Sequence, residues 1–177
     1  MRALIIGATG TIGSAVTTAL RAAGHTALAA SRNGEFTVDI SKAESIRVLY
    51  RTVGTVDAVI VCAGESSFAS LPDLTDEQIS FTIRNKVLVQ INVVRFGLNA
   101  VCNDGVFVLT SGLFSHSPVP GVAMKAIANG AIESFARAAA LDLPRGLRIG
   151  VVCPPYITAT ALTMGVSPHG SIDAADN

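Results

Sequence analysis

The feature that most constrains this chain is a glycine-rich turn, GATGTIG, at residues 7–13. It directly follows an apolar β-like run and precedes a helical pattern, so its backbone N–H groups meet at a helix N-terminus, where phosphate binds. Gly7 permits the tight turn, Gly10 allows close approach to a pyrophosphate, and Gly13 allows helix and strand to pack. A glycine-rich turn without a ligand is the alternative. The sequence predicts a dinucleotide site that includes Gly7, Thr9, Gly10, Thr11, Ile12 and Gly13.

Short apolar runs alternate with longer helical patterns along the chain, which is typical of a parallel sheet covered on both faces. The expected strands are residues 3–6, 26–30, 36–38, 56–62, 105–110 and 148–153. The expected helices are residues 12–23, 42–52, 76–101 and 124–143. With right-handed crossovers, these elements predict an α/β fold with a single doubly wound parallel sheet, a Rossmann fold, in the order 3-2-1-4-5-6.

The 177 residues suffice for one domain, which we place at residues 1–162, with a weakly ordered tail at 163–177. Half of the residues are hydrophobic and mean hydropathy is +0.51, which favours a homodimer or homotetramer. Formal net charge is zero and no basic stripe occurs, so nucleic acid is not an expected partner.

The N-terminal apolar run is far shorter than the roughly 20 residues of a membrane span and has no small-residue cleavage site. We therefore expect a cytoplasmic protein with no membrane partner. Cys62 and Cys153 each close a β-like run, and Cys102 falls late in the third helical pattern. Such positions are typical of buried free thiols, so no disulfide framework and no metal site are expected.

The end of the second strand bears on the choice of cofactor. An acidic residue there normally holds the ribose 2′-hydroxyl of NAD, but this chain has Ser31-Arg32. A guanidinium can pair with a 2′-phosphate, so NADP(H) is preferred over NAD(H) unless Arg32 is simply a solvated loop residue. Asp39, after the third strand, could accept a hydrogen bond from the adenine amino group or cap the next helix.

Several of these motifs recur in a known order, and together they resemble the short-chain dehydrogenase/reductase family over residues 1 to about 162. The motifs are the glycine turn, Asp39-Ile40, Cys62-Ala63-Gly64, Asn85, Ser111 and the run from Pro154 through Ile157 to Thr158. The resemblance implies hydride transfer with a nicotinamide cofactor and a small-molecule substrate. It implies that Ser111 orients a carbonyl, that Asn85 supports a proton relay, and that Ile40, Cys62, Ala63, Gly64 and Ile157 contact the cofactor.

The family's catalytic Tyr-x-x-x-Lys pair is replaced in this chain. Alignment of the following helix places Lys125 at the tyrosine position and Asn129 at the lysine position. Loss of a positioned general acid typically lowers a rate by about 10²–10⁴. Three side chains could substitute as the acid: Lys125, Tyr156 on the loop after the sixth strand, and His116 beyond Ser111. Each also has an interpretation without a catalytic role: Lys125 as a solvated lysine, Tyr156 as an aromatic wall of the cleft, and His116 as a surface histidine.

Three functions follow from these observations. The favoured one is an oxidoreductase that passes hydride between NADP(H) and a small carbonyl or alcohol, with Ser111, Asn85 and Lys125 at the site. The second is a non-catalytic NADP(H)-binding sensor or scaffold, since both members of the catalytic pair are lost. The third is a cofactor-independent lyase or isomerase that reuses the same cleft. Substrate identity has no readable code in the sequence.

Overall fold

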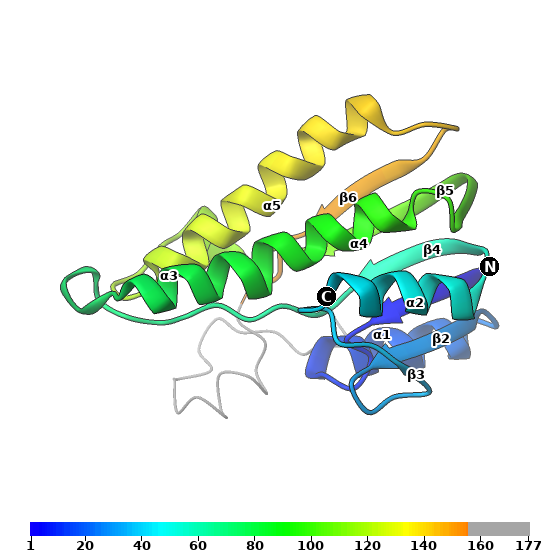
Figure 1. Cartoon of the computed structure of the whole chain (residues 1–177), viewed down its shortest axis with the longest axis horizontal. Helices are drawn as coiled ribbons and strands as arrows, with labels where there is room; N and C mark the ends of the chain where they lie inside the picture. Colours follow the sequence, from blue (N-terminus) through cyan, green and yellow to red (C-terminus); the bar gives the residue numbers. More distant parts are fainter. Residues whose placement is uncertain (156–177) are drawn as a thin grey trace.

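Six parallel strands form the centre of the computed structural model, which describes residues 1–155 of the chain. The strands are β1 (Arg2–Ile6), β2 (Thr26–Ser31), β3 (Phe36–Thr37), β4 (Val56–Val61), β5 (Val101–Thr110) and β6 (Arg148–Val152). Their order across the sheet is β3-β2-β1-β4-β5-β6, with every neighbouring pair parallel (Figure 1). The predicted doubly wound Rossmann fold is therefore confirmed.

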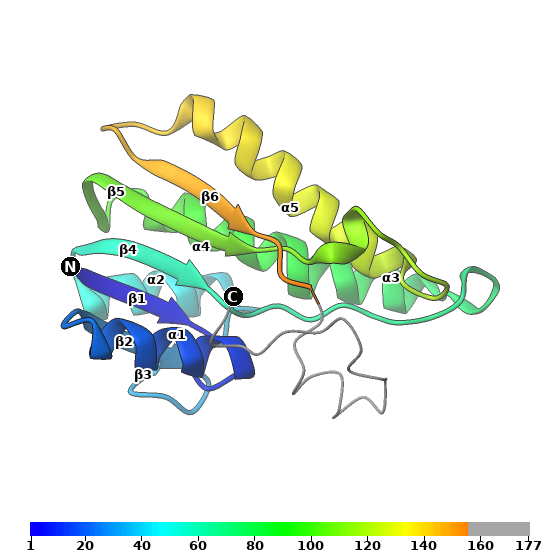
Figure 2. The ribbon, with the colours of Figure 1, turned by 180° about the vertical axis from the view of Figure 1, so that it is seen from behind.

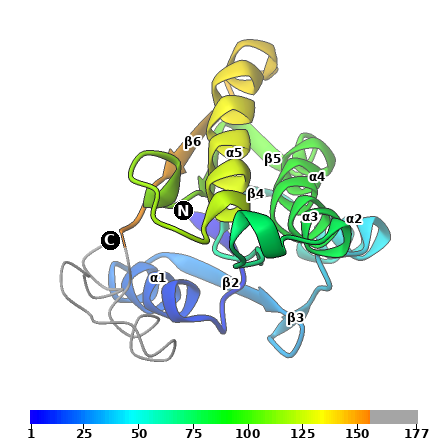
Figure 3. The same ribbon diagram turned by 90° about the vertical axis from the view of Figure 1, so that its left-hand side faces the viewer.

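Helices cover both faces of this sheet, as apolar parallel strands require. Figure 3 shows α1 (Thr11–Ala22) on one face and α2 (Ala43–Val53), α4 (Val89–Gly97) and α5 (Ala123–Asp142) on the other. The α2, α4 and α5 face holds the larger core, which includes Leu4, Phe107 and Ile132 at 0% exposure. The core beneath α1 is smaller and rich in alanine, so α1 can approach the sheet closely.

The predicted helix over residues 76–101 is wrong in two respects. It is divided into α3 (Asp76–Thr82), a π-helical segment η2 (Ile83–Leu88) and α4, and it ends at Gly97. At Gly97 the helix packs closely on α2, because a Cβ there would meet the Tyr50 hydroxyl oxygen at 2.5 Å. The chain then enters β5 at Val101, so Cys102 lies in a strand and not in a helix. Helix periodicity in the sequence revealed neither the close contact of Gly97 with Tyr50 nor the start of β5 at Val101.

The carboxyl ends of β1, β4, β5 and β6 meet at one edge of the sheet, where the arrowheads point in Figure 2. The loops after these strands include the glycine turn after β1 and two short 3-10 helices, η1 (Leu71–Asp73) and η3 (Leu113–Ser115). Ligands of open α/β sheets bind at this edge. Within residues 1–155, no helix has the length and apolar character needed to span a bilayer.

Candidate functional site

Two adjoining cavities lie along the carboxyl edge of the sheet. The first cavity, of about 590 Å³, lies over β1, β2 and the loop after β3, and it is lined by Ile6, Arg32 and Asp39 among others. The second cavity, of about 550 Å³, lies over β4 and β5, and it is lined by Ser111 and Lys125 among others. They share the wall formed by Cys62, Ala63, Gly64 and Glu65. An elongated ligand could therefore run from one cavity into the other.

The glycine turn forms one wall of the first cavity, and its glycines have different structural reasons. Gly7 has a φ of +89°, and a Cβ there would lie 2.7 Å from the Cys62 carbonyl oxygen. A Cβ at Gly13 would overlap the Gly7 carbonyl oxygen, so Gly13 sets how closely α1 packs on β1. A Cβ at Gly10 would meet only the Gly7 oxygen, at 3.4 Å. The fold therefore tolerates a side chain at residue 10, and what that side chain would occupy is the cavity.

The predicted cofactor residues divide between the cavities. Gly7, Thr9, Gly10, Ser31, Arg32, Asp39 and Ile40 line the first cavity, with the shared residues Cys62, Ala63 and Gly64. Ile12 lines the second cavity instead. Thr11 and Gly13 line neither cavity. Thr11 begins α1 and Gly13 is buried under it, so a contact to a ligand would have to come from the backbone of α1.

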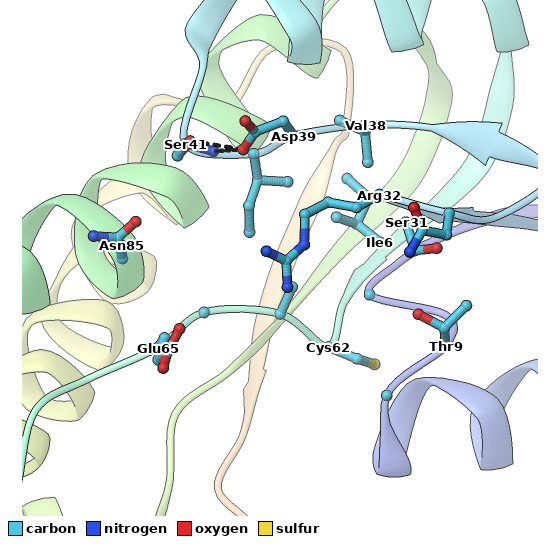
Figure 4. A pocket seen from close by; sticks show the side chains of 16 residues that line it. Ile6, Thr9, Ser31, Arg32, Val38, Asp39, Ser41, Cys62, Glu65 and Asn85 are labelled. Carbon is cyan, nitrogen blue, oxygen red and sulfur yellow. Dashed lines mark hydrogen bonds between the residues drawn. The ribbon is translucent and has the colours of Figure 1, made fainter.

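The end of β2 supplies an unpaired cation to the first cavity. Figure 4 shows the Arg32 side chain reaching into the cavity between Asp39 and Cys62. Among residues 1–155, no carboxylate forms an ion pair with Arg32. The neighbouring Ser31 hydroxyl is buried and has no hydrogen-bond partner within the described part of the chain. Buried polar atoms are normally satisfied, so this hydroxyl and the free guanidinium are suited to an anionic group.

Asp39 is engaged by its own loop. Its Oδ1 accepts hydrogen bonds from the Ser41 N–H at 3.1 Å and the Ser41 hydroxyl at 2.6 Å. The Ser41 hydrogen bond is the main cause that holds the Asp39 pKa below its ordinary value, with Lys42 nearby adding to it. The residue that caps α2 is Lys42, so the alternative in which Asp39 caps that helix is wrong. Asp39 remains on the wall of the first cavity.

Ser111 lies at the end of β5 in the second cavity and is 6% exposed. Its N–H donates to the Val152 carbonyl oxygen at 2.9 Å, which continues the β5 to β6 pairing and fixes the residue. Glu133 of α5 lies behind it, and burial opposes ionisation of that carboxyl. Hydrogen bonds from Ser115, Ser111 and His116 outweigh the burial and hold the Glu133 pKa below its ordinary value.

Lys125 and Asn129 come from the first turns of α5, and both line the second cavity. Lys125 is half-buried. Burial lowers the pKa of its amine, and the nearby Glu65 carboxylate acts in the opposite direction. The Asn129 side-chain amide donates to the Gly112 carbonyl oxygen at 3.0 Å, so it holds the loop after Ser111. The structure therefore brings Ser111 and Lys125 into one cavity.

Asn85 lies in η2 and lines the first cavity, apart from Ser111 and Lys125. Its side-chain amide donates to the Phe81 carbonyl oxygen at 2.9 Å, as a structural amide would. Its own carbonyl oxygen accepts from the Glu65 N–H at 3.0 Å. A π-helical turn disturbs the regular helix ladder at this point, so the Asn85 carbonyl is available to the β4 loop.

Of the two remaining candidate acids, only His116 lies within the residues that the structure describes. His116 Nε2 lies 3.0 Å from Glu133 Oε2, its side chain is 59% exposed, and it lines neither cavity. Tyr156 and Ile157, and the boundary expected at residue 162, lie outside the residues that the structure describes.

Lys86 is a residue of the second cavity that the sequence interpretation missed. It is 9% exposed, and its Nζ donates to the Thr110 carbonyl oxygen at 2.9 Å. Burial lowers the pKa of this amine to about 8, and the like charge of Lys125 contributes. A signal was present, because Lys86 stands four residues before Gln90 within a largely apolar helical stretch and so shares its buried face.

Comparisons with known proteins agree with this geometry. The crystal structure of the protein lin1944 from Listeria innocua has a TM-score of 0.94 and 37% identity, and the match covers 99% of this chain and 89% of that one. A small-chain dehydrogenase in complex with NADPH has a TM-score of 0.85 at 24% identity, covering 99% and 86%, and supports the fold.

Among curated proteins, glucose and ribitol dehydrogenase homolog 2 of Arabidopsis thaliana is 24% identical over 132 residues, 71% of this chain and 46% of that protein. Hydroxynaphthalene reductase arp2 of Aspergillus fumigatus is 28% identical over 110 residues, 62% and 40% respectively. The chain thus matches less than half the length of these relatives. The family model described as short chain dehydrogenase matches residues 1–170. With its fold and its site, the chain belongs to the short chain dehydrogenase family of oxidoreductases.

Proposed function

We propose that this protein passes hydride between NADP(H) and a small carbonyl or alcohol substrate. The observation that carries the proposal is the pair of adjoining cavities at one sheet edge. One has a glycine turn and an unpaired arginine, which suit a dinucleotide, and the other has Ser111 and Lys125, which suit a carbonyl oxygen. A long ligand that fills both would bring its far end to these side chains.

Several atoms of the first cavity support NADP(H) as its ligand. Within residues 1–155 the buried Ser31 hydroxyl has no hydrogen-bond partner and Arg32 has no carboxylate partner, and a Cβ at Gly10 would meet only the Gly7 carbonyl oxygen, at 3.4 Å. We assign the 2′-phosphate to Ser31 and Arg32, the adenine to Asp39 and Ile40, and the pyrophosphate to the glycine turn. Further cofactor contacts are proposed for Thr9, Thr11, Ile12, Gly13, Cys62, Ala63, Gly64 and Ile157.

NADP(H), when bound, supplies or accepts the hydride. The residues of the second cavity have the remaining tasks. Ser111, held by β5 and β6, would orient the carbonyl oxygen, and protonated Lys125 would donate a proton to that oxygen as charge develops on it. Half-burial makes the Lys125 amine a better acid than a solvated lysine. Asn85 would act through its carbonyl and the Glu65 loop, since its side-chain amide is engaged with Phe81.

A second candidate is a non-catalytic protein that binds NADP(H) as a sensor or scaffold. The observation that favours it is that the side-chain amide of Asn129, which we expect at the family's lysine position, holds the Gly112 carbonyl. Such a contact stabilises a loop and performs no chemistry. The third candidate, a cofactor-independent lyase or isomerase, draws no support from His116, because that side chain pairs with Glu133 outside both cavities.

Fluorescence titration with NADPH and NADH, followed by a panel of simple ketones and quinones, tests the proposal. We expect tighter binding of NADPH than of NADH and loss of reduced-nicotinamide absorbance with some carbonyl compounds. Binding without turnover of any compound would favour the sensor. Absence of binding for both nucleotides would contradict the proposal and the sensor together.

A cytoplasmic homodimer or homotetramer is part of the same proposal. Large apolar side chains are exposed at Leu88 of η2 and at Ile127 and Leu141 of α5, with exposed fractions of 44%, 53% and 88%. Contact between copies would bury them. Sedimentation velocity of the wild-type chain and of Ile127→Glu tests this, since a charge in the interface should shift the mass toward the monomer. Fractionation of source cells tests the location.

A further inference from the structure

The second cavity contains more positive charge than its own residues neutralise. Lys125 lies near the Glu65 carboxylate, which raises its pKa and so acts as a partial counter-charge. Lys86 has no such partner: among residues 1–155, no carboxylate forms an ion pair with it. Its one hydrogen bond goes to the neutral Thr110 carbonyl, although an ammonium group has three donors. Two donors of a nearly buried cation are therefore available.

The other titratable groups near Lys86 do not supply a negative charge. Lys125 carries the same sign. The Cys62 thiol lies close enough to interact, but burial raises its pKa to about 11, so it is a neutral thiol near pH 7. Glu65 is exposed and acts on Lys125. Lys86 itself stays largely protonated at pH 7, because its pKa of about 8 lies above that pH.

An unpaired buried charge is costly to a fold, and a bound anion removes part of that cost. Hydrogen bonds between an ammonium and a carboxylate are roughly twice as strong as those between neutral groups. Lys86 reaches the cavity from η2, Lys125 from α5, and Ser111 from the end of β5. A ligand with a carbonyl at Ser111 and Lys125 could therefore place a second oxygen group at Lys86.

We propose that Lys86 selects carbonyl substrates that also carry a carboxylate, by binding that carboxylate in the second cavity. This inference rests on the proposed function for the carbonyl itself, but the binding step needs no hydride transfer. The preference for an anion comes from Lys86, while Ser111 and Lys125 act at the carbonyl oxygen.

The test uses two probes that share the acetylphenyl group, the anion 4-acetylbenzoate and its neutral methyl ester, which is larger by one methyl group. Their affinities for the whole chain are measured by ligand-observed NMR titration, without cofactor and again with NADP⁺. The variant is Lys86→Met, and the matched control is Arg84→Met. Arg84 is exposed in the same η2 segment and donates only to the Ser80 carbonyl, so the control removes the same charge away from the cavity.

We expect the wild type to bind the acid at least about tenfold more tightly than the ester, and Lys86→Met to lose that preference. Arg84→Met should keep it. Equal affinity of the wild type for both probes would overturn the inference. Equal weakening of both probes in Lys86→Met would also overturn it, because that result indicates a structural role. A loss of NADPH affinity in Lys86→Met with the probe preference intact would assign Lys86 to the cofactor and overturn it as well.

If Lys86→Met does not fold, the pH dependence of probe affinity in the wild-type chain provides a second test. Acid affinity should fall as pH rises from 7 to 9.5, because Lys86 loses its proton, and ester affinity should stay constant. Lys125, Cys62 and Glu65 also face this region, so the titration is repeated in Lys125→Met, where the fall should persist. A fall that disappears with Lys125, or no fall at all, would overturn the inference. Because probe binding is followed without NADPH, failure of hydride transfer is recorded separately.

Discussion

The two cavities of this protein differ in whether backbone or projecting side chains form their unshared walls. Beyond the shared wall of residues 62–65, the first cavity has the backbone of the glycine turn, at Gly7 and Gly10. The second cavity has in its place side chains that project from η2, α5 and the end of β5. Backbone geometry follows from the fold and is hard to change, whereas a projecting side chain can be exchanged without altering the fold. Side chains of the second cavity can therefore differ from the family pattern, as we expect for Lys125 and Asn129, without any change in the glycine turn.

The substitution Lys125→Met tests the proposed proton donor of the second cavity. If Lys125 is the proton donor, kcat should fall by about 10²–10⁴ while the dissociation constant of NADPH stays within about twofold. Steady-state kinetics and NADPH fluorescence measure the two quantities. Arg137→Met removes a charge from an exposed position of the same helix and should leave both unchanged. If Lys125→Met also weakened NADPH binding, the assignment of separate roles to the two cavities would be contradicted.

The substitution Gly13→Ala tests the packing of α1 on the glycine turn beside the first cavity. Its Cβ would overlap the Gly7 carbonyl oxygen, so the free energy of unfolding should fall by about 3 kcal/mol, more than a hundredfold in the equilibrium. Gly130→Ala is the control, because its Cβ would meet nothing within 4 Å in the middle of α5. That variant should be more stable by roughly 0.5–1 kcal/mol. Urea unfolding measures both, and a small loss at Gly13 would show that the turn relaxes easily.

The substitution Arg32→Ala sharpens the assignment of the first cavity to NADP(H). Loss of a charge-assisted pair with the 2′-phosphate should weaken NADPH by about 10–100-fold and NADH by less than about twofold. The two dissociation constants are measured by fluorescence titration. Equal losses for the two nucleotides would remove the case for a 2′-phosphate site at Ser31 and Arg32.

The smallest expected effect concerns the support behind Ser111. The Glu133 pKa is lowered in the folded protein, so its stabilisation is present above the unfolded pKa and disappears as pH falls through the folded one. Glu133→Gln should therefore lower stability by about 1 kcal/mol at pH 7, and the difference from wild type should vanish in strong acid. Urea unfolding across pH measures this. A difference that does not depend on pH would indicate lost packing and no role for the charge.

Much of the first cavity was predictable from the sequence, and much of the second was not. Gly7 and Gly10 were assigned from a local motif between a strand and a helix, and Ser31 and Arg32 from the end of the second strand. All four line the first cavity. Lys86 was not identified as a site residue from the sequence, because its importance depends on burial, which η2 and the end of β5 create together. Asn85 was expected to belong to the same catalytic site as Ser111, but it lines the first cavity.

The sequence by itself determined the strand and helix alternation, the sheet order and the glycine turn between β1 and α1, because these follow from hydrophobic periodicity and from glycines close together in the chain. Only the tertiary structure decided where the third helical pattern ends, which side chains share a cavity, and which cations lack a carboxylate partner within residues 1–155. Gly97 meets Tyr50, Asn129 holds Gly112, and Lys86 reaches Thr110 across 24 residues of sequence. Such contacts form when elements pack, so local sequence rules cannot specify them.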